Sequence, residues 1–353
     1  MKWLTRNTAL VAGGIVVALL LAPQRGQAAV LTVEATYLFT PSGEAGLAYD
    51  VSPGVEHLYV LHKGQGTPSD PNGSNATLRA YSLLDPVPTL LAGYPVELAD
   101  GTSIEHGEIK LGMHFVREAT TVGGVAVPAG TLIVIRRGAT QNAEVVLTAV
   151  NKVTGAMFSA GSSEDVDTSL PAAGCQGVLL SGPAGLGFST VLDRFLSADV
   201  VCRPAVGELR GLIGSISVVS GAEVTGFFEV PGGLEPGADG QGDVKEHPRT
   251  RNLWVVGPPN RLLEFSTAGE LLREFAVVDK ATQGAIGLKR LAFDTLGQRL
   301  WLLTVAQSVY EMDVNATLYS SVPSLGPWGA MALALGLALS PFGLARWRRT
   351  RAR

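Results

Sequence analysis

The sequence predicts an all-β protein, and two observations lead to this prediction. Glycine and proline are frequent, with 43 Gly and 20 Pro in 353 residues, and both residue types favour turns and interrupt helices. Between residues 29 and 321, short apolar runs alternate with turn residues and show no long helical period. A chain of this length holds one large domain or two smaller ones.

Three segments of this region share one pattern. Residues 46–64 and residues 289–307 both contain Leu-Ala-aromatic-Asp, a turn, and then Leu-aromatic followed by further apolar residues. A third copy, in residues 243–275, is less regular. The Leu-Trp pairs that begin at Leu253 and Leu300 are 47 residues apart, which is close to the length of one propeller blade. The repeats therefore predict a β-propeller.

The repeated pattern resembles that of the NHL and related β-propellers, in which a Gly-x-Ala-aromatic-Asp strand precedes a Leu-aromatic-Val strand. Roughly 290 residues would hold six or seven blades. Asp50 and Asp294, which follow the first strand of a copy, are expected to accept hydrogen bonds from turn amides. Residues 261–275 are expected to form two strands around a turn at Gly269. The alternative fold is two β-sandwich domains, with a break between residues 160 and 173.

The N-terminal residues 1–28 have the features of a secretory signal peptide. Lys2 and Arg6 precede an apolar run of about 14 residues, and Gly26 and Ala28 place small residues where signal peptidase requires them. We therefore expect cleavage after Ala28. The alternative is an uncleaved anchor, although the apolar run is shorter than the roughly 20 residues that span a bilayer.

The C-terminal part has the features of a membrane anchor. Residues 328–345 form an uncharged stretch of 18 residues, which as a helix would be about 27 Å long and just cross the hydrocarbon core. Five arginines follow it, namely Arg346, Arg348, Arg349, Arg351 and Arg353. By the positive-inside rule these arginines stay in the cytoplasm, so the central region lies outside it, as the signal peptide also requires.

A short motif precedes this apolar stretch. It consists of Val322, Pro323, Ser324, Leu325, Trp328 and Gly329. Together with the apolar stretch and the arginines, it resembles the IPTL-CTERM class of exosortase-type sorting signals of Gram-negative bacteria, except that Gly326-Pro327 replaces the usual Ser and variable residue. The resemblance implies an exosortase-type enzyme that cuts near the motif. The precursor would be held in the inner membrane with a periplasmic body, which then reaches the cell surface or the medium. The alternative is an ordinary C-terminal anchor.

The sequence thus divides into a signal peptide (1–28), an extracytoplasmic propeller-like domain (29–321) and a sorting signal (322–353). The formal net charge is −4, and the two ends contain eight basic and no acidic residues, so the central domain has a net charge of −12. An acidic domain repels the phosphate backbone, which argues against nucleic-acid binding.

Cys175 and Cys202 are the only cysteines, and export predicts a disulfide between them.

Few residues point to chemistry. The densest polar cluster contains Glu105, His106, Glu108 and His114, and its spacing matches no established zinc motif. Two loops, 64–75 and 235–244, are rich in oxygen ligands of the kind that calcium prefers, with Asp239 and Asp243 in the second, but neither has the EF-hand spacing.

The sequence contains no catalytic motif, and it predicts no cofactor, metal or catalytic residue. We therefore expect a non-enzymatic body that binds or scaffolds an unknown surface or matrix ligand. The alternative is a propeller hydrolase or lactonase with a metal in the central channel, which convergence of Glu105, His106, Glu108 or Asp243 would favour.

Overall fold

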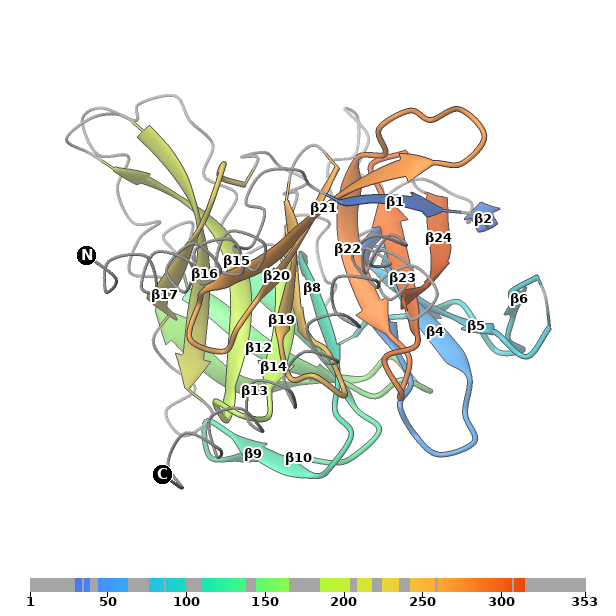
Figure 1. The fold of residues 1–353 in the computed structure, drawn as a ribbon. Coiled ribbons are helices and arrows are strands. Elements are labelled where there is room, and N and C mark those ends of the chain that lie inside the picture. The colour runs from blue at the N-terminus through green and yellow to red at the C-terminus, as the bar shows by residue number, and fades with distance from the viewer. Residues whose placement is uncertain are drawn as a thin grey trace, which may run out of the picture.

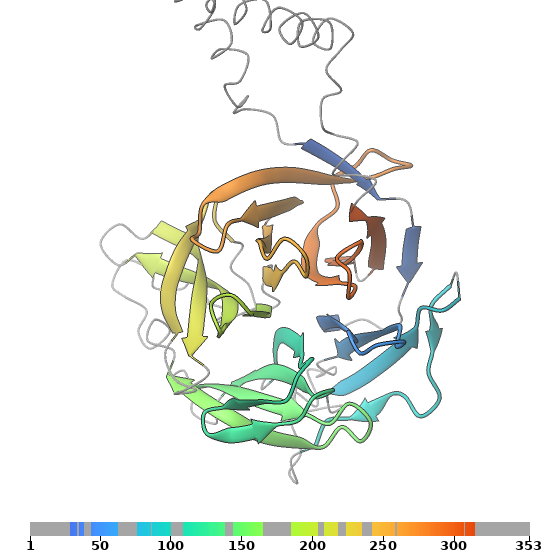
Figure 2. The same cartoon turned by 60° about the horizontal axis from the view of Figure 1, so that its bottom comes forward.

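The computed structural model describes residues 29–33, 35–38, 44–62, 76–85, 87–99, 109–137, 144–164, 185–203, 208–217, 224–234, 242–257, 260–306 and 308–314. Their regular elements are 24 β-strands. Five sheets are arranged around one axis as the blades of a β-propeller (Figure 1 and Figure 2). Within these ranges, no helix has the length and apolar character needed to cross a membrane.

The first three blades follow one another along the chain. Blade 1 contains β3 (Glu44–Tyr49), β4 (His57–His62), β5 (Thr77–Ser82), β6 (Thr89–Leu90) and β7 (Val96–Glu97). Blade 2 contains β8 (Ile109–Phe115), β11 (Leu132–Arg137), β12 (Glu144–Val150) and β13 (Met157–Glu164), with the hairpin of β9 (Thr120–Val122) and β10 (Val125–Val127) inserted after β8. Blade 3 contains β14 (Gly185–Ser189), β15 (Arg194–Arg203), β16 (Glu208–Ser217) and β17 (Val224–Val230).

The last two blades each include a strand from the beginning of the chain. Blade 4 contains β18 (Asp243–Glu246), β19 (Leu253–Gly257), β20 (Arg261–Phe265) and β21 (Leu271–Asp279), and β1 (Ala29–Val33) joins β21 in parallel. Blade 5 contains β22 (Leu288–Phe293), β23 (Arg299–Thr304) and β24 (Ser308–Asp313), and β2 (Ala35–Leu38) joins β24 antiparallel. The N-terminal strands therefore close the ring (Figure 2).

The first strands of the blades, β3, β8, β14, β18 and β22, contact one another in a closed ring around the axis. This close approach explains several glycines. A Cβ atom on Gly187 would lie 2.2 Å from the carbonyl oxygen of Val244, and one on Gly185 would lie 2.4 Å from the Cα atom of Asp243. Since real side chains do not approach backbone so closely, the glycines allow the inner strands of blades 3 and 4 to pack together.

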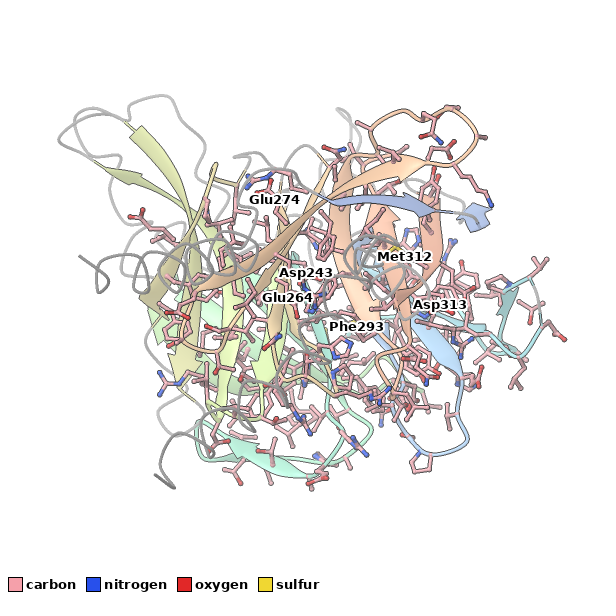
Figure 3. All side chains as sticks on the ribbon, viewed as in Figure 1. Asp243, Glu264, Glu274, Phe293, Met312 and Asp313 are labelled. Carbon is pink, nitrogen blue, oxygen red and sulfur yellow. The ribbon has the colours of Figure 1, made fainter. Side chains whose placement is uncertain are left out.

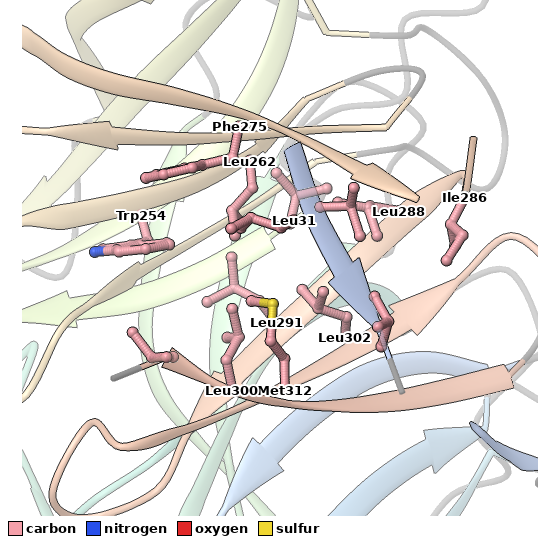
Figure 4. Packing of buried hydrophobic residues seen from close by; sticks show 14 of the residues in the cluster. Leu31, Trp254, Leu262, Phe275, Ile286, Leu288, Leu291, Leu300, Leu302 and Met312 are labelled. Carbon is pink, nitrogen blue, oxygen red and sulfur yellow. The ribbon is translucent and has the colours of Figure 1, made fainter. Parts of the chain in front are cut away.

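The core lies between the blades, with one buried apolar cluster at each of the five interfaces. The two Leu-Trp pairs of the sequence repeat lie on β19 and β23, and the side chains of Trp254 and Trp301 are each 1% exposed. Trp254 stacks on Phe275 with 5.6 Å between ring centroids. Leu31 from β1 is 1% exposed and packs into the same cluster between blades 4 and 5 (Figure 4). The first strand of the described chain is therefore part of the core.

The structure confirms the propeller and corrects the number of blades from six or seven to five. The blades begin at Glu44, Ile109, Gly185, Asp243 and Leu288. Only the last interval, 45 residues, is close to the repeat seen in the sequence. Blade 2 contains an inserted hairpin, and blade 3 has two strands of 10 residues each. The blades are therefore longer than the sequence repeat suggested. Five sheets around one axis also replace the alternative of two sandwich domains.

Several predictions lie outside the described residues. They concern the signal peptide with its cleavage site at Ala28, the sorting motif from Val322 to Gly329, the apolar stretch with its arginines, and the polar residues Glu105, His106, Glu108 and Asp239. Cys175 also lies outside, while Cys202 belongs to β15. The disulfide and the sorting signal remain predictions.

Candidate functional site

A pocket of about 560 Å³ lies where the inner strands of all five blades end. Each blade contributes residues from the carboxyl end of its first strand, including Tyr49, His114, Phe188, Lys245 and Phe293. The segment between β8 and β9 adds exposed charged residues at the rim, Arg117 and Glu118. The volume is in the range of small-molecule sites, so the pocket is the candidate functional site.

Asp243 organises the floor of this pocket. Its Oδ1 atom accepts hydrogen bonds from the amides of Leu186 (3.2 Å) and Val244 (3.0 Å), and its Oδ2 atom accepts one from the amide of Leu291 (3.0 Å). The carboxylate is completely buried near the middle of the molecule (Figure 3). One side chain therefore connects the inner strands of blades 3, 4 and 5.

Lys245 lies on the same face of β18, two residues after Asp243. Its ammonium donates to Oδ1 of Asp243 at 2.8 Å and to the carbonyl of Leu186 on blade 3. Burial lowers the pKa of Lys245, and Asp243 offsets part of this effect. The lysine is thus held by two acceptors and serves mainly to join blades 3 and 4.

His114 faces the pocket from blade 2. Its ring contacts Phe188 and Phe195, with centroids 5.9 and 5.8 Å away. Burial lowers the pKa of His114 to about 3, and Lys245 adds to this shift. The described residues make no hydrogen bond with either ring nitrogen. The imidazole is therefore neutral at physiological pH and offers the pocket one donor and one acceptor.

Two charged residues above the floor, Glu246 and Arg251, are also paired. Glu246 accepts hydrogen bonds from the hydroxyls of Ser189 (2.7 Å) and Thr190 (2.6 Å), and its Oε1 atom lies 3.1 Å from the guanidinium of Arg251. The side chain of Glu246 is only 4% exposed. This arrangement fixes the loop after β14 against blade 4 and satisfies the carboxylate.

The structure confirms the role expected for the aspartates of the repeat. Asp50 accepts a hydrogen bond from the amide of Ser52 at 3.0 Å, and Asp294 accepts one from the amide of Gln298 at 2.7 Å. Asp50 has an additional partner, the ammonium of Lys152 at 2.6 Å. This ion pair joins blade 1 to blade 2, which the spacing of the repeat did not indicate.

The polar residues singled out in the sequence have different positions. His114 lies in the pocket, and Asp243 lies beneath it. The structure does not describe Glu105, His106, Glu108 and Asp239, so it does not test their convergence. Within the described ranges, no group of three His, Cys, Asp or Glu side chains could hold a metal ion. Lys245 was missed, although its spacing of two from Asp243 places both residues on one face of a strand.

No protein-family model matches the chain, and no curated protein matches it in sequence. Among solved structures, a gluconolactonase from Xanthomonas campestris is 13% identical, with a TM-score of 0.39; the match covers 81% of this chain and 97% of the other. Kuenenia stuttgartiensis hydrazine synthase is 14% identical, with a TM-score of 0.37, over 80% and 67% of the two chains. At these values neither match supports a conclusion, and the fold assignment rests on the strand pairing.

Proposed function

We propose that the protein is an exported cell-envelope protein whose propeller binds a small ligand in the pocket at the end of its axis. The observation behind this proposal is that all five blades contribute to one pocket of about 560 Å³. Such a pocket is complete only when the ring is closed. A rigid ring with a lined depression is suited to holding a ligand in a fixed orientation.

Export and processing form the second part of the proposal. The signal peptide would direct the chain across the inner membrane, and an exosortase-type enzyme would act at residues 322–329. Residues 1–28 and 322–353 lie outside the described part of the chain. The support for this part of the proposal is therefore their sequence alone.

The second candidate is a hydrolase or lactonase. A general base works best with a pKa near the working pH, whereas the pKa of His114 is about 3. Lys245 is held by the carboxylate of Asp243 and the carbonyl of Leu186. The described part of the pocket therefore favours binding over proton transfer, and the enzyme is the less supported candidate.

Two experiments test the proposal. Mass spectrometry of the secreted protein, with and without the sorting protease, should show an N-terminus at Ala29 and, only when the protease is present, loss of the arginine-rich tail. An intact C-terminus at Arg353 in wild-type cells would contradict the processing.

For the body, a fragment screen by ligand-observed NMR should find compounds that compete for one site. A Thr295→Trp variant, which fills the pocket from blade 5, should abolish their binding; retained binding would contradict the pocket assignment.

A further inference from the structure

We propose that the pocket takes a small uncharged ligand that has an apolar body and a hydroxyl or amide group, and that His114 is the residue that binds this polar group. The inference rests on the proposed function, because it names the class of ligand for the same pocket. It depends on which polar groups of the pocket already have partners in the protein.

The charged side chains at and above the floor have partners. Lys245 is paired with Asp243 at 2.8 Å, and Glu246 is paired with Arg251 at 3.1 Å. Asp243 is completely buried, and the side chain of Glu246 is 4% exposed. A ligand that carried its own charge would have to be desolvated and would find no unpaired opposite charge among these four groups. The other charged residues that line the pocket, Arg117, Glu118 and Asp193, are exposed to solvent, where a charge pair contributes little. The buried part of the pocket therefore favours an uncharged ligand.

His114 is different from these residues. It lines the pocket, is partly buried, and makes ring contacts with Phe188 and Phe195 but no hydrogen bond with the described residues. A polar group that is held in an apolar surrounding without a partner costs free energy, so it needs water or a ligand. A neutral imidazole has one donor and one acceptor. Hydroxyl and amide groups also contain both a donor and an acceptor, so either group can hydrogen-bond to the imidazole of His114.

The walls supply the apolar part of the site. Met113, Phe115 and Val116 of β8 and the following residue line one side, and Phe188 and Phe293 line the others. Phe188 is the more exposed of these two rings and contacts the imidazole directly. A ligand whose apolar body lies against Phe188 would therefore bring its polar group to His114. This geometry orients the ligand as well as selecting it.

Three matched probes test the inference on the wild-type protein: 3-phenylpropan-1-ol, 3-phenylpropanoate and 3-phenylpropylamine. They share one apolar body and differ in charge. We expect the alcohol to bind at least about tenfold more tightly than either ion, measured by NMR titration, and to shift the imidazole nitrogen resonances of His114. If an ion binds as tightly as the alcohol, the pocket stands and the inference is overturned. If none of the probes binds although the fragment screen finds other ligands for the pocket, the inference is overturned, and if the screen also finds none, the proposed binding function itself fails.

Variants of His114 complete the test. His114→Leu should weaken alcohol binding about tenfold, which is the effect of one lost hydrogen bond, and His114→Gln should retain most of the affinity because the amide is both donor and acceptor. His57→Leu is the matched control, since His57 lies on β4 and does not line the pocket. Circular dichroism checks that each variant folds. Unchanged binding in a folded His114→Leu variant would overturn the role of His114. If that variant does not fold, the wild-type titration decides, because bound alcohol that leaves the imidazole resonances of His114 unshifted would also overturn this role.

Discussion

The ammonium of Lys152 lies 2.6 Å from Oδ2 of Asp50 and joins the turn after β12 in blade 2 to the end of β3 in blade 1. Asp50 is completely buried, while the side chain of Lys152 is 24% exposed. The tyrosine hydroxyl of Tyr94 also donates to the carbonyl of Lys152 at 2.6 Å. Asp50 therefore caps the turn after β3 and also pairs with a lysine of the neighbouring blade.

We expect Asp50 and Lys152 to be energetically coupled. In a double-mutant cycle with Asp50→Asn and Lys152→Met, the coupling free energy of unfolding should be about 1–2 kcal/mol, a value reduced by the exposure of the lysine. Burial alone would raise the pKa of Asp50, but the hydrogen bonds from Lys152 and Ser52 outweigh it and lower the pKa. The stabilisation is therefore present at neutral pH and should disappear as the pH falls below 3.8, the ordinary value. Chemical denaturation at several pH values measures both effects, and additive single variants would contradict the coupling.

Gly187 should be essential for the packing of blades 3 and 4. An added Cβ would lie 2.2 Å from the carbonyl oxygen of Val244, so we expect Gly187→Ala to reduce the free energy of unfolding by about 2–3 kcal/mol. Gly257→Ala is the control, because there the nearest atom would be 3.7 Å away, an ordinary contact. Thermal and urea unfolding compare the two variants. Equal stability of both would mean that the inner strands tolerate a wider ring.

Leu31 should stabilise the propeller although it lies on β1, the N-terminal strand at the outer edge of blade 4. It is 1% exposed in the cluster with Trp254 and Phe275, so Leu31→Ala should cost about 2–4 kcal/mol of unfolding free energy. Leu296→Ala is the control, since Leu296 is 56% exposed and should change stability by less than about 0.5 kcal/mol. Urea denaturation gives both values. A loss no larger than that of the control would show that β1 contributes little to the core.

His114 should remain neutral over the physiological range. Its pKa of about 3 in the folded state lies below the ordinary 6.5, so the unfolded chain takes up a proton first. The folded state is therefore penalised as the pH falls below 6.5, and His114→Phe should become progressively more stable relative to the wild type in acid. NMR of imidazole resonances should show no titration of His114 between about pH 8 and pH 5. A midpoint within that range would contradict the burial of the ring.

Cys175 and Cys202 should form a disulfide in the exported protein. The bridge would close a loop of about 27 residues and contribute roughly 3–4 kcal/mol in the chain-entropy model. Alkylation of the secreted protein before and after reduction, followed by mass spectrometry, counts the free thiols. We expect none before reduction and two after it. Cytoplasmic expression without the signal peptide is the control, and free thiols in the secreted form would rule the bridge out.

The sequence predicted the parts of the fold that depend on local patterns. Short strands, the turn at Gly269, which has a φ of 84°, and the aspartate-capped turns all follow from residue types and their spacing along one blade. The count of five blades did not follow, because the inserted hairpin and the long strands of blade 3 change the repeat length without changing the local pattern. Contacts between blades, such as that of Lys152 with Asp50, also have no local signal.

The residues of the pocket also could not be brought together from local sequence patterns. His114 was identified as a polar residue among several, yet its position depends on which strand of the blade contains it and on the number of blades around the axis. Asp243 was considered as an oxygen ligand in a flexible loop. It begins a strand instead, and its carboxylate bonds three backbone amides and a lysine. Neighbouring blades supply these partners, except for Val244 and Lys245, and the sequence alone did not indicate them.

The pairing of β2 with β24 has a consequence for biogenesis. Roughly 270 residues separate the two strands, so this contact has a very high sequence separation and we expect it to form late. If the chain crosses the membrane N-terminus first, β1 and β2 arrive in the periplasm long before their partners. Until blades 4 and 5 have followed, these early strands and the matching edges are open to other chains. Newly translocated molecules would then need a holding chaperone, or a low local concentration, to avoid exchanging strands with one another.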